Sequence, residues 1–446
     1  MDVGLSHCAG LDVHKKRVTA CRLIPAPTGQ QAEGMAELQT FSTMTRELLA
    51  LADWLAAAGI THIAMESTGE YWKPVYNLLE GTFTILLVNA AHGTNVPGRK
   101  TDKAEARWSA QLMRYGLLQA SFIPPAGQRD WRDLPRYRGK LVQERAREVN
   151  RVQGVLERAN ITLASVVSAM LGVSGRAMLE ALIAGQADPA ALAALAQRRR
   201  RSKLALLEQA LTGRGRDHHR RLLAMQLAHI DLLDEQITAR RATIHTCLLA
   251  LSPPTEPPDA SLETFAPPGG PAPAIAPPVP FPRAVELLET IPGVAQRGAA
   301  MLVAEIGVAL TRFGTAPRWA AWAGVAPGNN ESAGKQRSGK TRQGNHTLRA
   351  GLTQLAHAAV HTKDTYLAAL ERRLAARRGK KRAIRAVAHA IMVSAFYMLA
   401  RNEPYRELGG NYFDERQRQY TVDRLASRLE RLGYRVHLEP VAATAA

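Results

Sequence analysis

Residues 8–25 read CAGLDVHKKRVTACRLIP, and they begin with a short apolar run that predicts a β-strand containing Asp12. Further elements follow: predicted strands at 35–43, at 61–67 (ending in Glu66) and at 82–89, and predicted helices at 44–58 and at 101–118, the latter with Thr101 as N-cap. Strands that alternate with helices in this way predict an α/β domain with a mixed sheet over residues 1–125.

The middle of the chain, residues 126–250, has the periodicity of long helices. Apolar residues recur every seven positions in two series, Val142, Val149, Leu156 and Leu163, then Leu223, Ile230, Ile237 and Ile244. Two such helices joined by an Ala/Arg-rich connection predict an antiparallel helical hairpin, interpreted as a coiled coil. The seams can pack either inside one helical domain or between chains.

Proline content marks the clearest domain boundary. Residues 251–283 hold 12 of the 25 prolines, and such a stretch cannot sustain helix or ladder hydrogen bonds, so it predicts a linker. A mostly helical domain is predicted from 284 to 400, interrupted by a Gly/Asn/Ser/Lys-rich loop, and a charged tail from 401 to 446.

The charge of the 446-residue chain is strongly positive and unevenly distributed. Lys plus Arg number 58 and Asp plus Glu 39, a net charge of +19. Residues 1–125 carry 11 basic and 11 acidic residues, whereas 126–250 carry 21 and 12, and 284–446 carry 25 and 13. A neutral domain beside two basic ones predicts chemistry in the first and phosphate contacts, hence nucleic-acid binding, in the others.

Several protein classes are excluded by composition. Three cysteines without a CxxC pair rule out a disulfide framework and a zinc finger. Charged residues near the N-terminus argue against a signal peptide, and the longest apolar run, 386–400, is shorter than the ~20 residues a membrane span needs. We therefore expect a cytoplasmic protein with no membrane partner.

Four acidic residues of the first domain are candidate metal ligands. Asp12 lies inside an apolar strand, where a charge is costly unless it is paired or binds a cation. Asp102 and Glu105 are three residues apart and share one helix face. If the strand with Asp12 neighbours the strand that ends at Glu66, all four carboxylates converge at one end of the sheet. Such an oxygen cage suits Mg²⁺ or Mn²⁺ and phosphoryl displacement.

The loop of residues 324–349 combines flexible backbone with positive charge. It contains Ser332 and the polar or cationic residues Lys335, Arg337, Lys340, Arg342, Asn345 and Arg349. Ser332 could act as a nucleophile on phosphorus, with the cations stabilising the developing charge. From the residues alone the loop could equally bind phosphate without reaction, and Ser338 would compete with Ser332.

A third motif precedes this loop. Residues 287–307 predict a helix, a turn at Ile291-Pro292-Gly293 and a second helix beginning near Ala295. The pattern is that of a helix–hairpin–helix, which directs backbone N–H groups at a phosphate, so Gly293 is a candidate nucleic-acid contact. An ordinary helical turn is the alternative.

Taken together, these motifs resemble the transposases of insertion sequence family 110, also called DEDD transposases. GLDVHKK, AMESTGEYW and VPGRKTDKAEA are similar to the family's RuvC-like, RNase H-like domain. IPGVAQRGAAMLVAEIG, WAAWAGVAPGNNESAGKQRSGKTRQGNHTLR and RRGKKRAIRAVAHAIM are similar to its C-terminal transposase domain. Two departures are Glu105, where the family usually has Asp, and the proline-rich insert.

The resemblance implies a recombinase that excises and inserts its element. It assigns metal ligation to Asp12, Glu66, Asp102 and Glu105, and a covalent link to DNA to Ser332 in ESAG. It also implies a structured guide RNA from the element and a homo-oligomer, a dimer to tetramer.

Two other functions fit the residues. One is a metal-dependent nuclease or junction resolvase in which Ser332 binds phosphate without reacting. The other is a non-enzymatic protein that bridges nucleic acids, although four converging acids are poorly suited to simple binding of a polyanion.

Overall fold

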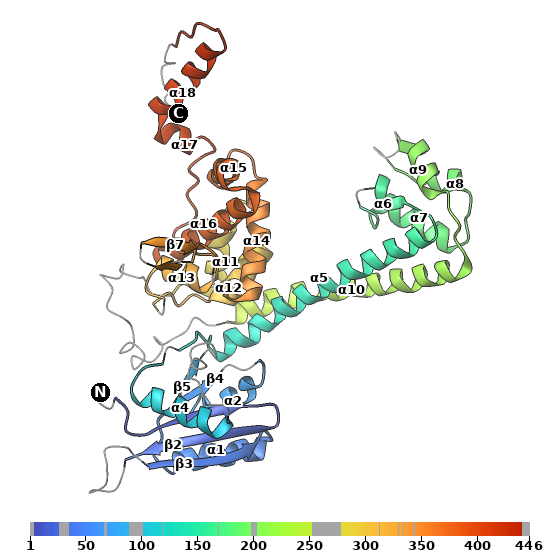
Figure 1. Cartoon of the computed structure of the whole chain (residues 1–446). Helices are drawn as coiled ribbons and strands as arrows, with labels where there is room; N and C mark the ends of the chain where they lie inside the picture. Colours follow the sequence, from blue (N-terminus) through green and yellow to red (C-terminus); the bar gives the residue numbers. More distant parts are fainter. Residues whose placement is uncertain are drawn as a thin grey trace. The chain divides into compact units, whose positions relative to one another are not determined.

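The computed structural model describes residues 4–25, 35–66, 69–88, 101–118, 120–167, 169–197, 203–251, 278–311, 313–328, 330–332, 334–341 and 344–438 (Figure 1). These residues form two compact units, one up to Ala126 and the other from Gly127 onward. Most of the proline-rich insert lies outside the described residues.

The first unit is an α/β domain. Its elements are β1 (Cys8–Val13), β2 (Arg17–Ile24), β3 (Met35–Ser42), α1 (Thr45–Ala56), β4 (His62–Glu66), α2 (Trp72–Leu79), β5 (Thr84–Val88) and α4 (Asp102–Arg114). The strand order is β3-β2-β1-β4-β5, with antiparallel pairing among β1, β2 and β3 and parallel pairing of β4 with β1 and β5. The mixed sheet predicted from the sequence is therefore confirmed.

Pairing of β1 with β4 brings two predicted site residues to one edge. The two strands run parallel, with Leu11 opposite Met65, so Asp12 and Glu66 both follow this last pair. The expectation that their strands are neighbours is confirmed. The sequence did not separate residues 8–25 into two strands, which form a tight hairpin closed by a bond from the His14 N–H to the Arg17 carbonyl (2.9 Å), and it did not predict α2.

Alternation along the strands decides which side chains face α4. Ala9, Leu11 and Val13 of β1 belong to the core that packs against α1 and α2, whereas Cys8 belongs to the core under α4. Successive side chains of a strand point to opposite faces, so Gly10 and Asp12 lie on the α4 side. By the same parity Glu66 follows Ala64 onto that side.

Gly10 allows the backbone of α4 to approach the sheet directly. A Cβ at this position would lie 2.2 Å from the Ala106 carbonyl oxygen and 2.5 Å from the Ala110 nitrogen. The first turn of α4, which is capped by the Thr101 side chain accepting a bond from the Ala104 N–H, then lies beside the end of β1. Gly10 therefore sets the distance between the acids of the strand and those of the helix.

We predict that Gly10→Ala destabilises the first unit by about 1–3 kcal/mol, the usual cost of overpacking a tight core. The matched control is Gly139→Ala in the middle helix described below, where an added Cβ meets nothing within 4 Å. Because glycine disfavours helix interiors, the control should raise stability by about 0.5–1 kcal/mol. Urea denaturation measures both, and equal effects of the two changes would contradict the packing argument.

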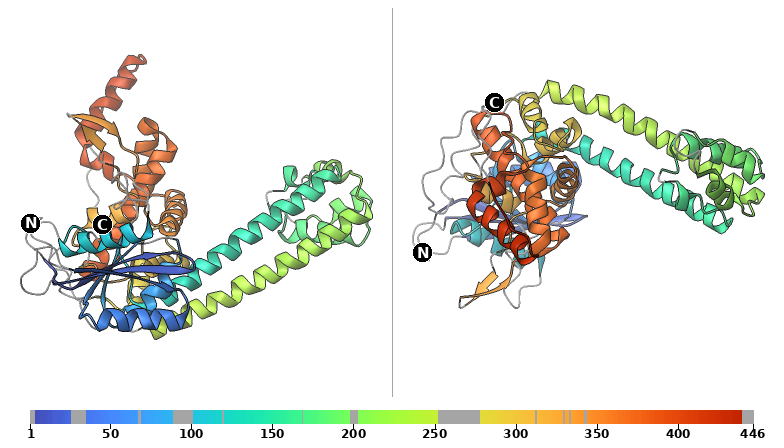
Figure 2. Two further views of the ribbon diagram at one scale, coloured as in Figure 1. Left: turned by 60° about the horizontal axis from the view of Figure 1, so that its bottom comes forward. Right: turned by 90° about the horizontal axis from the view of Figure 1, so that it is seen from above.

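The second unit begins with a helical hairpin. Its elements are α5 (Ala126–Arg158), α6 (Leu163–Val166), α7 (Val173–Ile183), α8 (Pro189–Ala194), α9 (Leu204–Leu211) and α10 (Asp217–Ala250). Figure 2 shows α5 and α10 running side by side in opposite directions. Ion pairs join them, Arg145 to Asp234 (2.5 Å) and His229 to Glu148 (3.7 Å, when the imidazole is protonated), and Trp131 donates to the Ile244 carbonyl (3.2 Å).

The predicted heptad seams are partly buried within this same hairpin. Leu156, Leu163, Leu223 and Ile230 share a core with α7, α8 and α9, whereas Val142 is 40% exposed. Packing inside one helical domain accounts for the buried positions, and a coiled coil between chains stays a prediction. Helix α5 ends at Arg158, so the first heptad series is divided between α5 and the short α6, which contains Leu163.

The remainder of the second unit is mostly helical, as predicted. Its elements are α11 (Phe281–Glu289), α12 (Gln296–Ile306), α13 (Ala316–Trp322), β6 (Asn330–Ser332), β7 (Lys335–Ser338), α14 (His346–Val360), α15 (Tyr366–Arg378), α16 (Lys380–Arg401), α17 (Tyr412–Arg416) and α18 (Arg418–Arg431). Among the described helices, α16 is long and apolar enough to cross a membrane, but 61% of its apolar stretch is buried inside the structure. It packs against α11, α13, α14 and α15, as a core helix does.

Candidate metal centre and serine loop

Asp12 and Asp102 come together with a histidine that the sequence analysis did not select. One ligand atom each from Asp12, His14 and Asp102 lies within 4.8 Å of the others. His14 Nε2 is 3.2 Å from Asp12 Oδ2 and 3.5 Å from Asp102 Oδ1. The available signal was the spacing of Asp12 and His14, because residues two apart on an extended chain share a face.

Glu66 and Glu105 surround this group without belonging to its tight set of ligand atoms. Burial raises the pKa of Asp12, and the negative charges of Glu105 and Asp102 raise it further, against the opposing effect of His14. Burial likewise raises the pKa of Glu66, and the negative charges of Glu105 and Asp12 raise it further. All four predicted acids therefore interact electrostatically at this end of the sheet.

Arg17, at the start of β2, is a cation in the same cluster. Its Nη2 lies 2.6 Å from Asp102 Oδ2. Although loss of water acts to raise the pKa of Asp102, Arg17 and His14 outweigh it, and the net shift is downward. Asp102 is thus held ionised by Arg17, while Asp12 is left as the buried member of the group.

The donor set fits a divalent cation. Asp12 is 4% exposed, and its Oδ2 is buried with no hydrogen-bond partner of good geometry among the described residues. A buried carboxylate oxygen without such a partner is costly unless a cation neutralises it. Carboxylate oxygens suit Mg²⁺, and an added imidazole also suits Mn²⁺, so Asp12, Asp102 and His14 can hold such an ion.

We predict that Asp12→Asn stabilises the metal-free protein at neutral pH while it abolishes metal binding. A carboxyl group whose pKa is raised on folding stabilises the fold when protonated, and that contribution is lost as the pH rises through the raised pKa. The asparagine carries no charge to bury, so its advantage should disappear at acidic pH, where Asp12 is protonated.

Thermal unfolding in EDTA or in Mn²⁺ checks this, with Asp53→Asn on the exposed face of α1 as the control. Mn²⁺ should raise the melting temperature of the wild type and of the control, but not that of Asp12→Asn. A metal-induced rise that survives in Asp12→Asn would exclude Asp12 as a ligand.

Ser332 is the last residue of β6, at the turn of a two-stranded hairpin. β6 pairs antiparallel with β7, with Ser332 opposite Lys335, and Gly334 in the turn has φ of +72°. For Ser332 and Arg337 the structure describes the backbone alone, and Arg342 lies outside the described residues. Ser338, the competing serine, accepts a bond from the Lys340 N–H (3.2 Å), which ties its hydroxyl into a local turn.

Glycines close the base of this loop. A Cβ at Gly328 would lie 2.2 Å from the Lys340 carbonyl oxygen, and one at Gly344 would lie 2.6 Å from the Gly324 nitrogen. The incoming and outgoing backbones therefore touch, and Lys335 and Lys340 remain exposed on the loop between them. The glycines of this loop predicted a flexible backbone, and the structure shows that Gly328 and Gly344 also allow this close approach.

Asn345 connects the loop to a buried acid. Its Oδ1 accepts from the Leu348 N–H (3.1 Å) and so caps α14, while its Nδ2 donates to Glu305 Oε2 (2.6 Å). Both ends of the amide are thus engaged inside the protein. Contact between Asn345 and nucleic acid, expected from the sequence, remains a prediction.

Glu305, on α12, is 1% exposed and is neutralised by α5. Arg136 binds it through two hydrogen bonds of 2.6 and 2.9 Å, and Arg132 lies 3.7 Å away while donating to the Ala304 and Glu305 carbonyls. Burial lowers the pKa of Arg132 to about 10, with Glu305 acting in the opposite direction. This cluster fixes α5, α12 and the start of α14 to one another.

We predict that Glu305→Ala destabilises the second unit by about 3–5 kcal/mol, because it leaves largely buried arginines without their counter-charge. The control is Glu286→Ala, which breaks an exposed pair with Arg283 (3.0 Å) and should cost at most about 1 kcal/mol. Chemical denaturation monitored by circular dichroism distinguishes the two. A small effect of Glu305→Ala would mean that water replaces the carboxylate.

Gly293 lies in the predicted turn, between α11 and α12, with φ of +81°. A Cβ there would lie 2.3 Å from the Ala359 nitrogen of α14. The helix–turn–helix shape is as expected, and packing against α14 accounts for the glycine. Its predicted role in binding nucleic acid stays a prediction.

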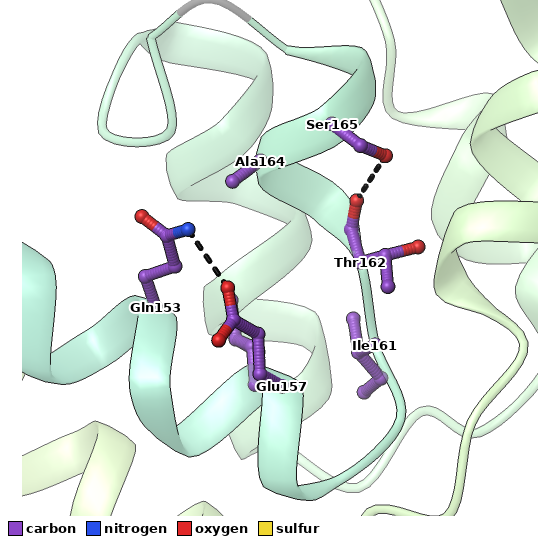
Figure 3. A pocket seen from close by; sticks show the side chains of 7 residues that line it. Gln153, Glu157, Ile161, Thr162, Ala164 and Ser165 are labelled. Atoms are coloured by element: carbon purple, nitrogen blue, oxygen red, sulfur yellow. Dashed lines mark hydrogen bonds between the residues drawn. The ribbon is translucent and has the colours of Figure 1, made fainter.

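A pocket in the helical hairpin offers no competing site (Figure 3). Three of its polar side chains are used inside the hairpin: Gln153 donates to Glu157 (2.8 Å), and Ser165 donates to the Thr162 carbonyl (2.7 Å). The pocket is lined by Gln153, Leu156, Glu157, Ile161, Thr162, Ala164 and Ser165.

Two family models match the chain. The first, for DEDD transposases of the IS110 type and described as "Transposase", covers residues 9–161. The second, described as "Transposase IS116/IS110/IS902 family", covers residues 285–371. Together they span more than half of the chain, and they include the acidic cluster, the serine loop and Glu305. No curated protein matches the chain.

Proposed function

The chain belongs to the IS110 family of transposases and is therefore an enzyme that acts on insertion-sequence DNA, and we propose that it cuts and rejoins this DNA with a serine nucleophile and a divalent metal ion. The observation that carries the metal part is the buried Oδ2 of Asp12, which has no hydrogen bond of good geometry among the described residues and lies beside Asp102 and His14. The serine part rests on the place of Ser332 in the loop of the second matched region.

Asp12, Asp102 and His14 are proposed to hold the ion. Glu66 and Glu105, to which the family resemblance also assigns metal ligation, complete its negative surroundings. When bound, Mg²⁺ or Mn²⁺ would polarise the scissile phosphate and neutralise charge on its oxygens. Arg17 holds Asp102 ionised and in place. The longer side chain of Glu105, one turn along α4 from Asp102, can reach toward both Asp12 and Glu66, in keeping with its effect on the pKa of each.

Ser332 is proposed to attack phosphorus. A new Oγ–P bond forms while the bond from phosphorus to one deoxyribose oxygen breaks, and the serine proton leaves as the released oxygen gains one. The reverse reaction with another DNA end restores the serine and rejoins the strand. Lys335 and Lys340, exposed on the loop, can stabilise the added negative charge.

Two partners belong to the same proposal. The positive charge outside the first unit suits DNA and a structured guide RNA from the element. A homo-oligomer, dimer to tetramer, is also proposed. The alternative of a metal-dependent nuclease without a serine nucleophile is separated from this proposal by the experiment below.

We predict that Ser332→Ala abolishes both strand cleavage and the covalent protein–DNA adduct, while DNA affinity stays close to that of the wild type. Loss of a catalytic nucleophile typically costs on the order of 10⁴–10⁶ in rate. Ser338→Ala is the matched control, because it removes the other hydroxyl of the same hairpin and should leave cleavage largely intact.

Denaturing gels of DNA labelled at one end measure both products. Cleavage by Ser332→Ala in Mg²⁺ would establish the metal-dependent nuclease instead. An adduct formed by Ser332→Ala but not by Ser338→Ala would move the nucleophile to Ser338.

A further inference from the structure

Helices α14 and α16 pack against each other, and neither contains an acidic residue. Their sequences are HTLRAGLTQLAHAAV and KKRAIRAVAHAIMVSAFYMLAR. Figure 1 shows the two helices adjacent in the C-terminal part of the second unit. A cation on either helix therefore finds no carboxylate on its own helix or on the facing one.

Arg385, in the second turn of α16, is a half-buried cation that has no counter-charge among the described residues. Its Nη1 is buried and has no hydrogen-bond partner among the described residues. Burial lowers the pKa of Arg385, and the positive charge of Arg349 on α14 lowers it further. No ion pair of Arg385 or Arg349 occurs within the part of the chain that the structure describes.

This arrangement destabilises the protein on its own. A buried donor without an acceptor loses its hydration and gains nothing in return, and a guanidinium keeps its charge under all physiological conditions. Two guanidinium groups that repel each other in a partly buried place are stabilised when an anion lies between them. The chain supplies no such anion on α14 or α16.

Phosphate is the anion that fits best. Guanidinium groups bind phosphate oxygens through paired, charge-assisted hydrogen bonds, and two of them can hold separate oxygens of one group. Arg349 lies one turn into α14, whose first turn has no acidic residue and begins at the end of the loop that carries Ser332. The partial positive charge of this helix end adds to the attraction for an anion.

We propose that Arg349 and Arg385 form a binding site for one phosphodiester group of the DNA backbone. The inference rests on the proposed action on DNA, and it adds Arg385, which lies within the stretch RRGKKRAIRAVAHAIM but was not among the candidate nucleic-acid contacts. Because the site holds a backbone phosphate, it fixes the position of DNA beside the loop without reading its sequence.

The test compares Arg385→Gln with wild-type protein in binding a short DNA duplex over a range of salt concentrations. Loss of one phosphate contact should weaken binding to unrelated sequences uniformly and reduce the slope of log affinity against log salt by about 1. Arg349→Gln should give the same result. An unchanged slope in both variants would overturn the site.

Arg401→Gln is the matched control. It removes an exposed arginine from the far end of the same helix, about 24 Å away at 1.5 Å per residue, where the guanidinium stacks over Tyr397 at 5.2 Å. Its salt slope should equal that of the wild type. An equal drop in slope for Arg401→Gln and Arg385→Gln would mean a diffuse effect of net charge and no discrete site.

Thermal unfolding supplies an independent readout. Without ligand, Arg385→Gln should melt no lower than the wild type, because it relieves a repulsion, and inorganic phosphate should raise the wild-type melting temperature more than that of the variant. A large drop in the melting temperature of the ligand-free variant would show that Arg385 has an internal structural role instead.

Weakened binding of a single-stranded RNA with unchanged DNA binding would overturn the assignment to DNA.

These measurements require no strand cleavage. Their outcome therefore does not depend on whether Ser332 is the nucleophile. Ser332→Ala should retain the full salt slope, and failure of the serine mechanism would leave the phosphate site intact.

Discussion

The buried carboxylate of Glu305 joins three parts of the larger unit. It receives both nitrogens of the Arg136 fork from α5 and the amide of Asn345 at the start of α14, while its own helix, α12, follows the glycine turn. Taking such a group out of water is costly, and its partners repay that cost only when all are in place. The position of the serine loop relative to the long hairpin therefore depends on one side chain that touches no solvent.

Charge is arranged differently in the two units. In the first, acidic groups lie close enough to raise the pKa of Asp12 and Glu66, and Arg17 neutralises part of them. In the second, α14 and α16 carry cations and no acids. Each unit is thus strained in its ligand-free form, by excess negative charge in one and excess positive charge in the other. In the proposed function, a divalent cation and DNA would relieve these strains separately.

Local patterns were sufficient to predict most elements of the first unit, and the meeting of the acids followed only once β1 was found beside β4. Period-two alternation places Asp12 and Glu66 on one face of the sheet, and the spacing of Asp102 and Glu105 places both in the first turn of α4. The sequence did not reveal β2 as a separate strand because only residues 14–16 divide it from β1, and it did not reveal α2 because that helix is only 8 residues long. The role of Gly10 appears with the packing of α4, whose contacting residues lie about a hundred positions away.

Roles that depend on long-range neutralisation could not be read from local sequence. Arg136 and Glu305 are 169 residues apart, and nothing near either one identifies the other as its partner. Asn345 resembled a contact for nucleic acid, yet its amide is used at both ends inside the fold. Arg385 belongs to a basic stretch of sequence, and the sequence alone does not distinguish a solvent-exposed arginine from a buried arginine without an ion pair.

The close approach at Gly10 bears on how one judges whether a copy of an insertion sequence still encodes a functional transposase. Mobile elements accumulate defective copies, and a natural screen is to ask whether the acidic residues and the serine survive. Gly10 carries no chemistry and would pass unnoticed in that screen. Yet a Cβ there would overlap the backbone of α4, so we expect a side chain at this position to move α4 away from β1 and to separate Asp102 from Asp12. A copy that keeps its acidic residues and its serine would then lose the proposed metal site through the gain of a single methyl group.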